Sequence, residues 1–469
     1  MSFKKAILAL CLIVPAKSFS QRCNCYNDFI WLKNTFEKND AGFEWTINKK
    51  GVETYNNFSD SITSIAKVTS EMTSCENLLN DWTKFFRKGH IGIYSNSTAS
   101  NTHKPTLVSK TMECNTNELN KIEKGIQGIW QIDSTYALGI TLLNDSSNRK
   151  YVGSIVESKT PEWKQGEIKI EFFENNNKLK ANYYMRDHSF NTFDVEQLSD
   201  NELKVGYIYL VRKSKMNSID PLESEILFTD QCKVVELSNK TMLIRIPSFE
   251  YSQKHQIDKA ISKNLKAITS HENLIIDLRD NGGGADNSFS SLVPLIYTNP
   301  IQYHSVEFLA TPLNIESFKG MNSSFLARIL IRKYIKKLER NPGQYVNLFD
   351  DEIITVKQKK IYKNPSKIYV LVNEGCASST EQFILEAKQS SKVKIVGTNT
   401  FGALDVSNVT TINSPDSLFT LIYSMSRTLA PQNERIDGIG IKPDIIIPRT
   451  VMRLEWIKFA KGKIEAEQN

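Results

Sequence analysis

The feature that most constrains the fold is a unit repeated in the C-terminal half of the chain, in which a short, continuous apolar segment precedes a loop or a helical pattern. Three such segments occur, at residues 273–278, 367–372 and 393–397. A strand without polar alternation is buried on both faces, as in a parallel sheet covered by helices. A helical pattern follows the second segment, from about Ser378 to Lys388. The repeat therefore predicts an α/β fold for this half of the chain.

An insertion at residues 300–365 separates the first two units and contains a predicted amphipathic helix, Ser323–Arg340. One face of this helix carries Leu326, Leu330, Tyr334 and Leu338. Lysines and arginines cover much of the remaining surface. A solvated face on a packed helix explains this pattern, and a basic binding surface is the alternative.

The N-terminal half divides into two regions by the period of its apolar residues. Residues 21–125 are predicted as a largely helical region, because apolar residues recur there at spacings of three and four. From about Gly128 the period changes to two, which predicts short strands. A small β-rich domain is therefore expected at residues 126–215, either a barrel or a compact sheet. The composition, 40% hydrophobic and 24% charged, is that of an ordinary globular protein.

The first twenty residues have the pattern of a secretory signal peptide. Lys4 and Lys5 precede an apolar stretch that is too short to span a bilayer, and Ser18 and Ser20 provide small residues before a cut after Ser20. An uncleaved N-terminal anchor is the alternative. The pattern predicts an exported protein, periplasmic or extracellular, with no membrane segment after cleavage.

The cysteines and charges exclude several other classes of protein. Six of the seven cysteines remain after cleavage, and an even number in an oxidising compartment permits disulfides. No pair or cluster of cysteines and histidines has zinc-ligand spacing, so we expect no metal and no cofactor. The net charge of +7 is spread along the chain, so nucleic-acid binding is not expected. No feature indicates an oligomeric state.

A glycine-rich loop follows the first buried strand, with the sequence Asp277-Leu278-Arg279-Asp280-Asn281-Gly282-Gly283-Gly284. Glycines allow successive N–H groups to converge on one point and bind an anion. The spacing is not that of a dinucleotide or P-loop motif, which disfavours a phosphate site. An oxyanion hole fits the loop better, whereas a plain tight turn does not explain three glycines.

A second loop, residues 373–381, joins a strand to a helix and carries Ser378. Glu381 stands three residues later, so Ser378 could simply cap the helix in a capping box. A serine at a strand-to-helix elbow could equally serve catalysis, because the helix N-terminus favours negative charge and the Ser379 N–H could complete an oxyanion hole. Spacing alone does not decide between these two interpretations.

Four motifs in order resemble the C-terminal processing (tail-specific) peptidases, over roughly residues 240–448. They lie at residues 277–284, 375–381, 396–402 and 438–444. The family consists of serine peptidases with a crotonase-like α/β core. The resemblance implies that Ser378 is the nucleophile and that Gly282, Gly283 and Ser379 form the oxyanion hole. It also implies a polypeptide substrate, with a peptidase core at residues 216–460.

The sequence departs from the family at the general base. Most members carry a lysine directly after the Thr-Phe-Gly motif, and this chain has Ala403 there. The tricorn-like branch is similar to this chain in lacking the lysine, and it places a histidine in a segment that resembles residues 86–92. The resemblance thus implies His90 as base and Asp437 as a supporting carboxylate, with direct contact between the two left open.

These features predict an exported serine peptidase that hydrolyses polypeptides through an acyl-enzyme on Ser378. A catalytically silent peptide-binding protein with the same fold is the alternative, because the lysine is lost. Cys376 is a competing nucleophile, although its position before the helix disfavours it. Many family members place a PDZ domain where residues 126–215 lie, but the number of strands here favours a barrel-like domain over a PDZ-like one.

Overall fold

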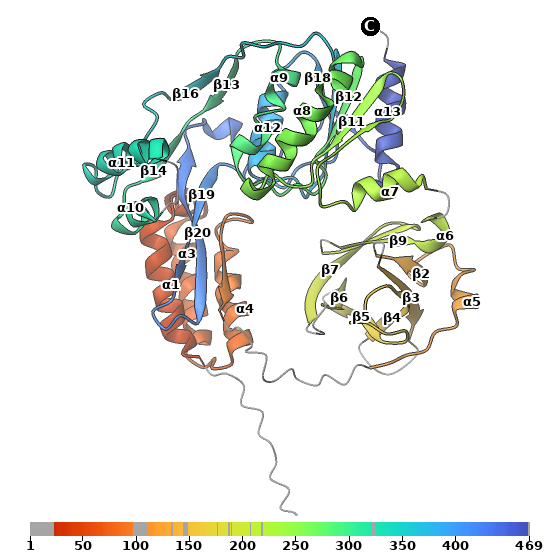
Figure 1. Ribbon diagram of the computed structural model, residues 1–469. Helices are drawn as coiled ribbons and strands as arrows, with labels where there is room; N and C mark the ends of the chain where they lie inside the picture. The colour runs from red at the N-terminus through yellow and green to blue at the C-terminus, as the bar shows by residue number, and fades with distance from the viewer. Residues whose placement is uncertain are drawn as a thin grey trace, which may run out of the picture. The chain divides into compact units, whose positions relative to one another are not determined.

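The computed structural model describes residues 23–96, 110–132, 135–143, 149–175, 177–185, 188, 190–206, 208–216, 219–320 and 325–467. The predicted signal peptide lies outside the described residues. The chain divides into two compact units, each built from several segments (Figure 1). The first comprises Met1–Ser97, Phe308–Val346 and Asn408–Ser426, and the second comprises Thr98–Glu307, Asn347–Ser407 and Arg427–Asn469.

The first unit begins with four helices that pack around aromatic side chains. They are α1 (Cys25–Asn39), α2 (Phe43–Lys50), α3 (Val52–Ala66) and α4 (Met72–Thr83). The fully buried Trp82 ring meets the rings of Phe29 and Phe36 edge-on, each at 5.6 Å between centroids. A disulfide between Cys25 and Cys75 joins α1 to α4. Aromatic packing and one covalent link therefore hold this helical layer together.

A small sheet completes the first unit and includes strands that are distant in sequence. Its order is β1-β20-β14-β15, and β19 also pairs with β20. The strands are β1 (Gly92–Ser95), β14 (Val306–Leu309), β15 (Tyr345–Asn347), β19 (Val406–Asn413) and β20 (Phe419–Thr428). Two helices of the insertion, α10 (Pro312–Lys319) and α11 (Phe325–Glu339), pack against each other in the same unit. The segment after α4 thus forms a strand, β1, within the region predicted as largely helical.

The second unit begins with a closed eight-stranded barrel in which each strand pairs with the next and β2 pairs with β9. The strands are β2 (Gly128–Gln131), β3 (Tyr136–Leu142), β4 (Arg149–Ser158), β5 (Ile168–Asn175), β6 (Lys178–Tyr184), β7 (Phe190–Ser199), β8 (Glu202–Val205) and β9 (Ile208–Arg212). Large side chains such as Trp130, Phe172 and Leu203 fill the interior. Gly206, whose φ is +60°, lies between β8 and β9, where the chain reverses direction.

A six-stranded sheet forms the centre of the second unit, in the order β10-β11-β12-β17-β18-β21. All neighbouring strands are parallel except β10 and β11. The strands are β10 (Lys233–Glu236), β11 (Thr241–Arg245), β12 (Asn273–Asp277), β17 (Lys367–Val372), β18 (Val393–Gly397) and β21 (Ile445–Ile446). The three apolar segments of the sequence are therefore neighbours in one sheet.

Helices cover both faces of this sheet, which explains why its strands are apolar throughout. One face packs against α8 (Lys254–Ser270) and α12 (Ser379–Ala387). The other packs against α7 (Pro221–Leu227) and α13 (Trp456–Ala466). Short elements complete the unit: α5 (Thr116–Leu119), α6 (Lys213–Met216), α9 (Val293–Ile296), β13 (Ile301–His304) and β16 (Ile353–Val356). Among the described residues, no helix is long and apolar enough to cross a membrane.

A buried ion pair fixes the end of the central strand β12. The Asp277 carboxylate accepts from the Arg279 guanidinium at 2.8 and 2.7 Å, and both side chains are fully buried. Arg245 donates to the Arg279 carbonyl at 2.6 Å. Burial raises the pKa of Asp277, but the charges of Arg279 and Arg245 outweigh it and leave that pKa below its usual value. The Asp-Leu-Arg motif is thus a structural anchor for the glycine loop that follows.

We expect Asp277→Ala to lower the free energy of unfolding by about 3–5 kcal/mol, because it leaves a guanidinium buried without its partner. Since the folded pKa is lowered, the contribution is present above the unfolded pKa of ~3.9 and is lost as pH falls below it. Urea unfolding followed by circular dichroism at several pH values measures both effects. Asp351→Ala removes an exposed carboxylate and should change stability by less than about 0.5 kcal/mol. Equal losses for the two variants would contradict the prediction.

Candidate active site

Ser378 lies at a strained elbow between strand β17 and helix α12. Its φ is 57° and its ψ is −125°, whereas a serine that only caps a helix has an extended backbone. Residues held in this region cost of order 1–3 kcal/mol and occur mostly at functional sites. The same conformation turns the nucleophile outward in strand–serine–helix elbows. The backbone geometry therefore favours the catalytic interpretation of Ser378 over simple capping.

The glycine loop is bonded directly to this elbow, chiefly through Asn281. The Asn281 carbonyl accepts from the Ala377 N–H at 3.2 Å, and its side-chain oxygen accepts from the Thr380 hydroxyl at 2.8 Å. The Ser379 hydroxyl donates to the Gly284 carbonyl at 3.0 Å. These bonds fix the glycine loop against the first turn of α12. The roles of Asn281 and Thr380 could not be predicted from sequence, because side-chain hydrogen bonds between distant loops leave no periodic signal.

Gly283 approaches the elbow so closely that only glycine fits there. Its φ is +98°, and a Cβ at this position would lie 2.7 Å from the Ser378 Cβ. The Gly283 N–H donates to the Asn281 side chain at 3.0 Å. In the described part of the chain, the amides of Gly282 and Ser379 have no hydrogen-bond acceptor. Of the three predicted oxyanion donors, these two amides are therefore available to a ligand.

Ala403, the position of the missing lysine, contacts Ser378 through the backbone. Its carbonyl accepts from the Ser378 N–H at 3.0 Å. The buried Glu381 carboxylate joins the same parts of the site, because it accepts from the N–H groups of Ala403 at 2.8 Å and Ser378 at 3.2 Å. Burial raises the pKa of Glu381, and the hydrogen bonds that it accepts lower it only in part. Glu381 thus does more than cap α12, since it ties the elbow to the loop around position 403.

We expect Ala403→Lys to leave peptidase activity at or below the wild-type level. The Ala403 side chain is 4% exposed, so a lysine there overpacks the site at a cost of about 1–3 kcal/mol. Steady-state hydrolysis by Ala403→Lys and by the uncharged, similarly long Ala403→Met measures the effect. A strong gain confined to the lysine variant would place the general base at this position instead of at His90.

Asp437 holds the backbone that follows Ala403. Its carboxylate accepts from the N–H groups of Leu404, Asp405 and Val406 at 2.7, 2.8 and 3.2 Å. In return, the Asp405 carboxylate accepts from the Asp437 N–H. Burial and the neighbouring charge of Asp437 raise the pKa of Asp405 to about 6. In the structure, Asp437 therefore stabilises the loop that follows Ala403, beside the elbow.

His90 belongs to the first unit, whereas Ser378, Gly282, Gly283, Ser379 and Asp437 belong to the second. Its backbone has a φ of 57°, and its carbonyl accepts from Arg87 at 3.0 Å and from the Ser424 hydroxyl at 3.1 Å. Arg87 also binds the buried Asp40 carboxylate through both of its terminal nitrogens. The segment that carries His90 is thus fixed by a buried ion pair. The pairing of His90 with Ser378 stays a prediction.

The barrel is joined to both loops of the site by charged side chains. The Glu374 carboxylate, on the elbow segment, accepts from Lys204 at 2.6 Å and from the Tyr209 hydroxyl. Burial raises the pKa of Glu374, but these two partners outweigh it and bring that pKa to about 2. Arg453 lies over the Tyr209 ring at 3.7 Å and binds Asp280 of the glycine loop. These contacts could not be inferred from sequence.

Cys376 is not a plausible nucleophile. Its side chain is fully buried, and its thiol donates to the Leu278 carbonyl at 3.1 Å. Burial raises the pKa of the Cys376 thiol, which keeps it protonated. It therefore packs behind the elbow as a small apolar residue.

A comparison with known protein families gives a match over the segment that contains the elbow and the glycine loop. Residues 240–447 match peptidase family S41. The matched segment covers less than half of the chain. It includes the four sequence motifs, the elbow and the glycine loop, so the predicted resemblance to C-terminal processing peptidases is confirmed and the predicted class, a serine-type peptidase, is supported.

Individual relatives are similar over the same part of the chain. A probable CtpA-like serine protease of Staphylococcus epidermidis is 25% identical over 220 residues, which cover 41% of this chain and 44% of that protein. A Staphylococcus aureus protein of the same description is 26% identical over 218 residues. The match thus spans less than half the length of these curated relatives. The crystal structure of mature CPAF is similar in fold, with a TM-score of 0.54 at 14% identity, over 94% of this chain and 96% of that one.

Proposed function

We propose that this protein is an exported serine peptidase that hydrolyses polypeptides through an acyl-enzyme on Ser378. The observation that carries the proposal is the strained Ser378 backbone, held against the glycine loop of an S41 domain. Strain of this kind is maintained only where surrounding contacts impose it, and here Glu381, Ala403 and the close approach of Gly283 do so. A capping serine alone would not need this conformation.

In the first step, the Ser378 hydroxyl attacks the scissile carbonyl while a base removes its proton. Negative charge develops on the carbonyl oxygen, and the amides of Gly282 and Ser379 are the donors available to stabilise it. The N-terminus of α12 favours the same charge. Gly283 serves mainly by its lack of a side chain, which lets the loop approach Ser378. The base then gives the Ser378 proton to the nitrogen of the leaving amine as the peptide C–N bond breaks, which leaves the acyl group on Ser378. Water, deprotonated by the same base, attacks the acyl carbon, and the proton passes to the Ser378 oxygen as the ester bond breaks.

We assign the role of general base to His90. Position 403, which touches Ser378, has no titratable side chain, so the base must come from elsewhere. The buried Arg87–Asp40 pair beside His90 is the kind of rigid support that a catalytic imidazole requires, because it fixes the backbone from which the ring projects. Asp437 takes part in this proposal as the residue that orders the loop after Ala403.

Two observations support export. The sequence of residues 1–20 has the pattern of a signal peptide. The structure contains a disulfide, Cys25–Cys75, and such links persist mainly in oxidising compartments. N-terminal sequencing of the protein recovered outside the cytoplasm tests the expected start at Gln21, and a sequence that began at Met1 would contradict cleavage.

A fluorophosphonate probe tests the proposed activity without knowledge of the substrate. The probe reacts with activated serines, so we expect it to label the wild-type protein at Ser378, identified by peptide mass spectrometry. Casein hydrolysis measured in parallel should be lost in the labelled protein. A folded wild-type protein that is neither labelled nor hydrolytic would instead favour the silent peptide-binding alternative.

A further inference from the structure

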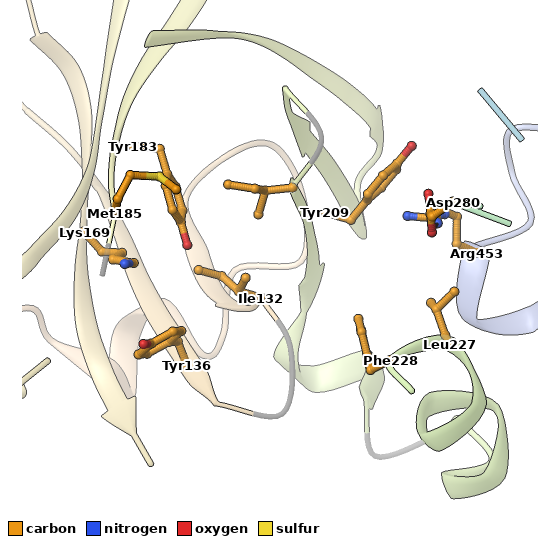
Figure 2. A pocket seen from close by; sticks show the side chains of 11 residues that line it. Ile132, Tyr136, Lys169, Tyr183, Met185, Tyr209, Leu227, Phe228, Asp280 and Arg453 are labelled. Atoms are coloured by element: carbon orange, nitrogen blue, oxygen red, sulfur yellow. Dashed lines mark hydrogen bonds and ion pairs between the residues drawn. The ribbon is translucent and has the colours of Figure 1, made fainter. Parts of the chain in front are cut away.

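The barrel cavity and helix α11 both carry charged side chains that take no part in the proposed reaction. The cavity has a volume of about 410 Å³, and Figure 2 shows the side chains that line it. Its charged groups already contact other groups, because Arg453 binds Asp280 and Lys169 lies against three aromatic rings. On α11, by contrast, Arg332 and Lys336 are exposed. The charges that a partner could reach are therefore those of the helix.

The C-terminal end of α11 is fixed to the first unit. Leu338, in the last turn, is fully buried, and α11 packs against α10 (Figure 1). Lys319, at the end of α10, binds Glu339 of α11 at 3.7 Å. These contacts determine which side of α11 is turned away from the unit.

The apolar face that the sequence predicts for this helix is covered only at that end. Leu330 lies on the same face as Leu338, about two turns earlier, yet its side chain is 47% exposed. The adjacent Ile329 side chain is 53% exposed. Two neighbouring large apolar side chains are thus in contact with water, and their transfer to an apolar environment would be favourable.

The same helix is strongly basic. It contains five lysines and arginines and a single acidic residue, Glu339, which Lys319 already binds. Arg332 and Lys336 lie three and seven residues after Ile329, so these three side chains share one face. No ion pair joins Arg332 or Lys336 to another residue in the part of the chain that the structure describes. The exposed face therefore combines unpaired positive charge with apolar surface.

This combination distinguishes between the possible partners. A nucleic acid would bind the positive charges through its phosphates, but it would leave Ile329 and Leu330 in water. A second copy of the same face would bring like charges together. The surface of an anionic bilayer satisfies both features, because its headgroups attract lysine and arginine and the acyl boundary beneath them accepts apolar side chains.

We propose that α11 docks the protein on an anionic lipid bilayer, with Ile329 and Leu330 inserted at the acyl boundary and Arg332 and Lys336 at the headgroups. Each basic residue at such a surface strengthens binding about fivefold, and burial of the two apolar side chains adds to this effect. The proposal does not depend on the peptidase reaction, since none of these residues takes part in it.

Co-sedimentation with lipid vesicles tests this proposal on the protein that starts at Gln21, so that the predicted signal peptide cannot insert. We expect binding to vesicles of phosphatidylcholine and phosphatidylglycerol in equal amounts, and weaker binding at high salt, which screens exposed charges. Arg332→Gln combined with Lys336→Gln should weaken binding at least about tenfold. Ile329→Gln combined with Leu330→Gln should do the same, because glutamine keeps the helix propensity and removes the apolar surface.

Lys259→Gln combined with Lys263→Gln is the matched control. It removes two exposed lysines from α8, a helix on which no large apolar side chain is exposed, and it should leave vesicle binding unchanged. An equal loss in this control would overturn the assignment to α11, and equal binding to vesicles of phosphatidylcholine alone would overturn the role of the charges. Binding of a DNA duplex without binding of vesicles would overturn the proposal in favour of a nucleic-acid site. Absence of binding to the anionic vesicles by the wild-type protein would overturn it outright.

Discussion

Ser378→Ala should lower the rate of polypeptide hydrolysis by about 10⁵–10⁶-fold, because loss of the nucleophile from a serine peptidase removes the acyl-enzyme route altogether. The substitution should cost little stability. The lost hydroxyl is worth ~1 kcal/mol where it caps α12, and alanine bears the φ of 57° about as well as serine does. Stopped assays with casein and fluorophosphonate labelling measure the loss of function, and thermal unfolding measures the stability.

A matched control separates this effect from the general removal of a buried serine. Ser390 is 8% exposed, follows α12 and bonds the N–H of Lys392, away from the elbow. Ser390→Ala should therefore keep near-normal turnover and full labelling. If Ser378→Ala hydrolysed casein at a rate close to wild type, the nucleophile would have to lie elsewhere and the proposed mechanism would fail.

Much of the segment that matches peptidase family S41 could be predicted from sequence because its strands are buried on both faces. The segments 273–278, 367–372 and 393–397 are continuous apolar runs, and the structure has β12, β17 and β18 there. Such a run predicts a buried strand without any knowledge of the partner strands. The elbow and the glycine loop could also be predicted from sequence. The serine and the glycines there are required by local backbone geometry, and such local requirements produce short sequence motifs.

Contacts between distant segments were beyond the reach of sequence patterns. Strand β1 pairs with β20, more than 300 residues later, through the register Gly92↔Ile422. Neither strand has a pattern that specifies the other, so the N-terminal helices and the segment Asn408–Ser426 could not be assigned to one compact unit from sequence. The hydrogen bonds from Lys204 and Tyr209 to Glu374 could not be predicted from sequence either, because polar pairs across an interface have no periodicity.

This pairing changes how the role of His90 should be tested. A truncated protein starting near residue 216 would lack β1, and it would also lack Asp40, whose carboxylate accepts from the Ser424 N–H at 3.1 Å. Strand β20 would then lose a neighbour and a buried hydrogen-bond partner. Inactivity of such a fragment would say little about catalysis. A point substitution in the full-length protein isolates the imidazole and leaves β20 covered.

His90→Ala should lower hydrolysis by about 10⁴-fold or more and should abolish labelling by the fluorophosphonate, since an unassisted serine is a poor nucleophile. A neutral imidazole is needed to accept the Ser378 proton. Wild-type activity should accordingly fall at acidic pH, where the imidazole is protonated. A lysine base would instead require a pKa brought far down by its surroundings.

His304→Ala provides the matched control, because His304 is half-buried and bonds the Glu434 carboxylate at 3.0 Å, yet it is not proposed as the base. It should retain near-normal activity and the same acidic limb. Arg87→Met tests the support of His90 separately, because it removes the bond to the His90 carbonyl while the imidazole stays. We expect this displacement of the base to lower kcat and to leave the form of the pH profile unchanged. If His304→Ala were inert and His90→Ala active, the base would be His304, and the proton transfer would take place entirely within the second unit.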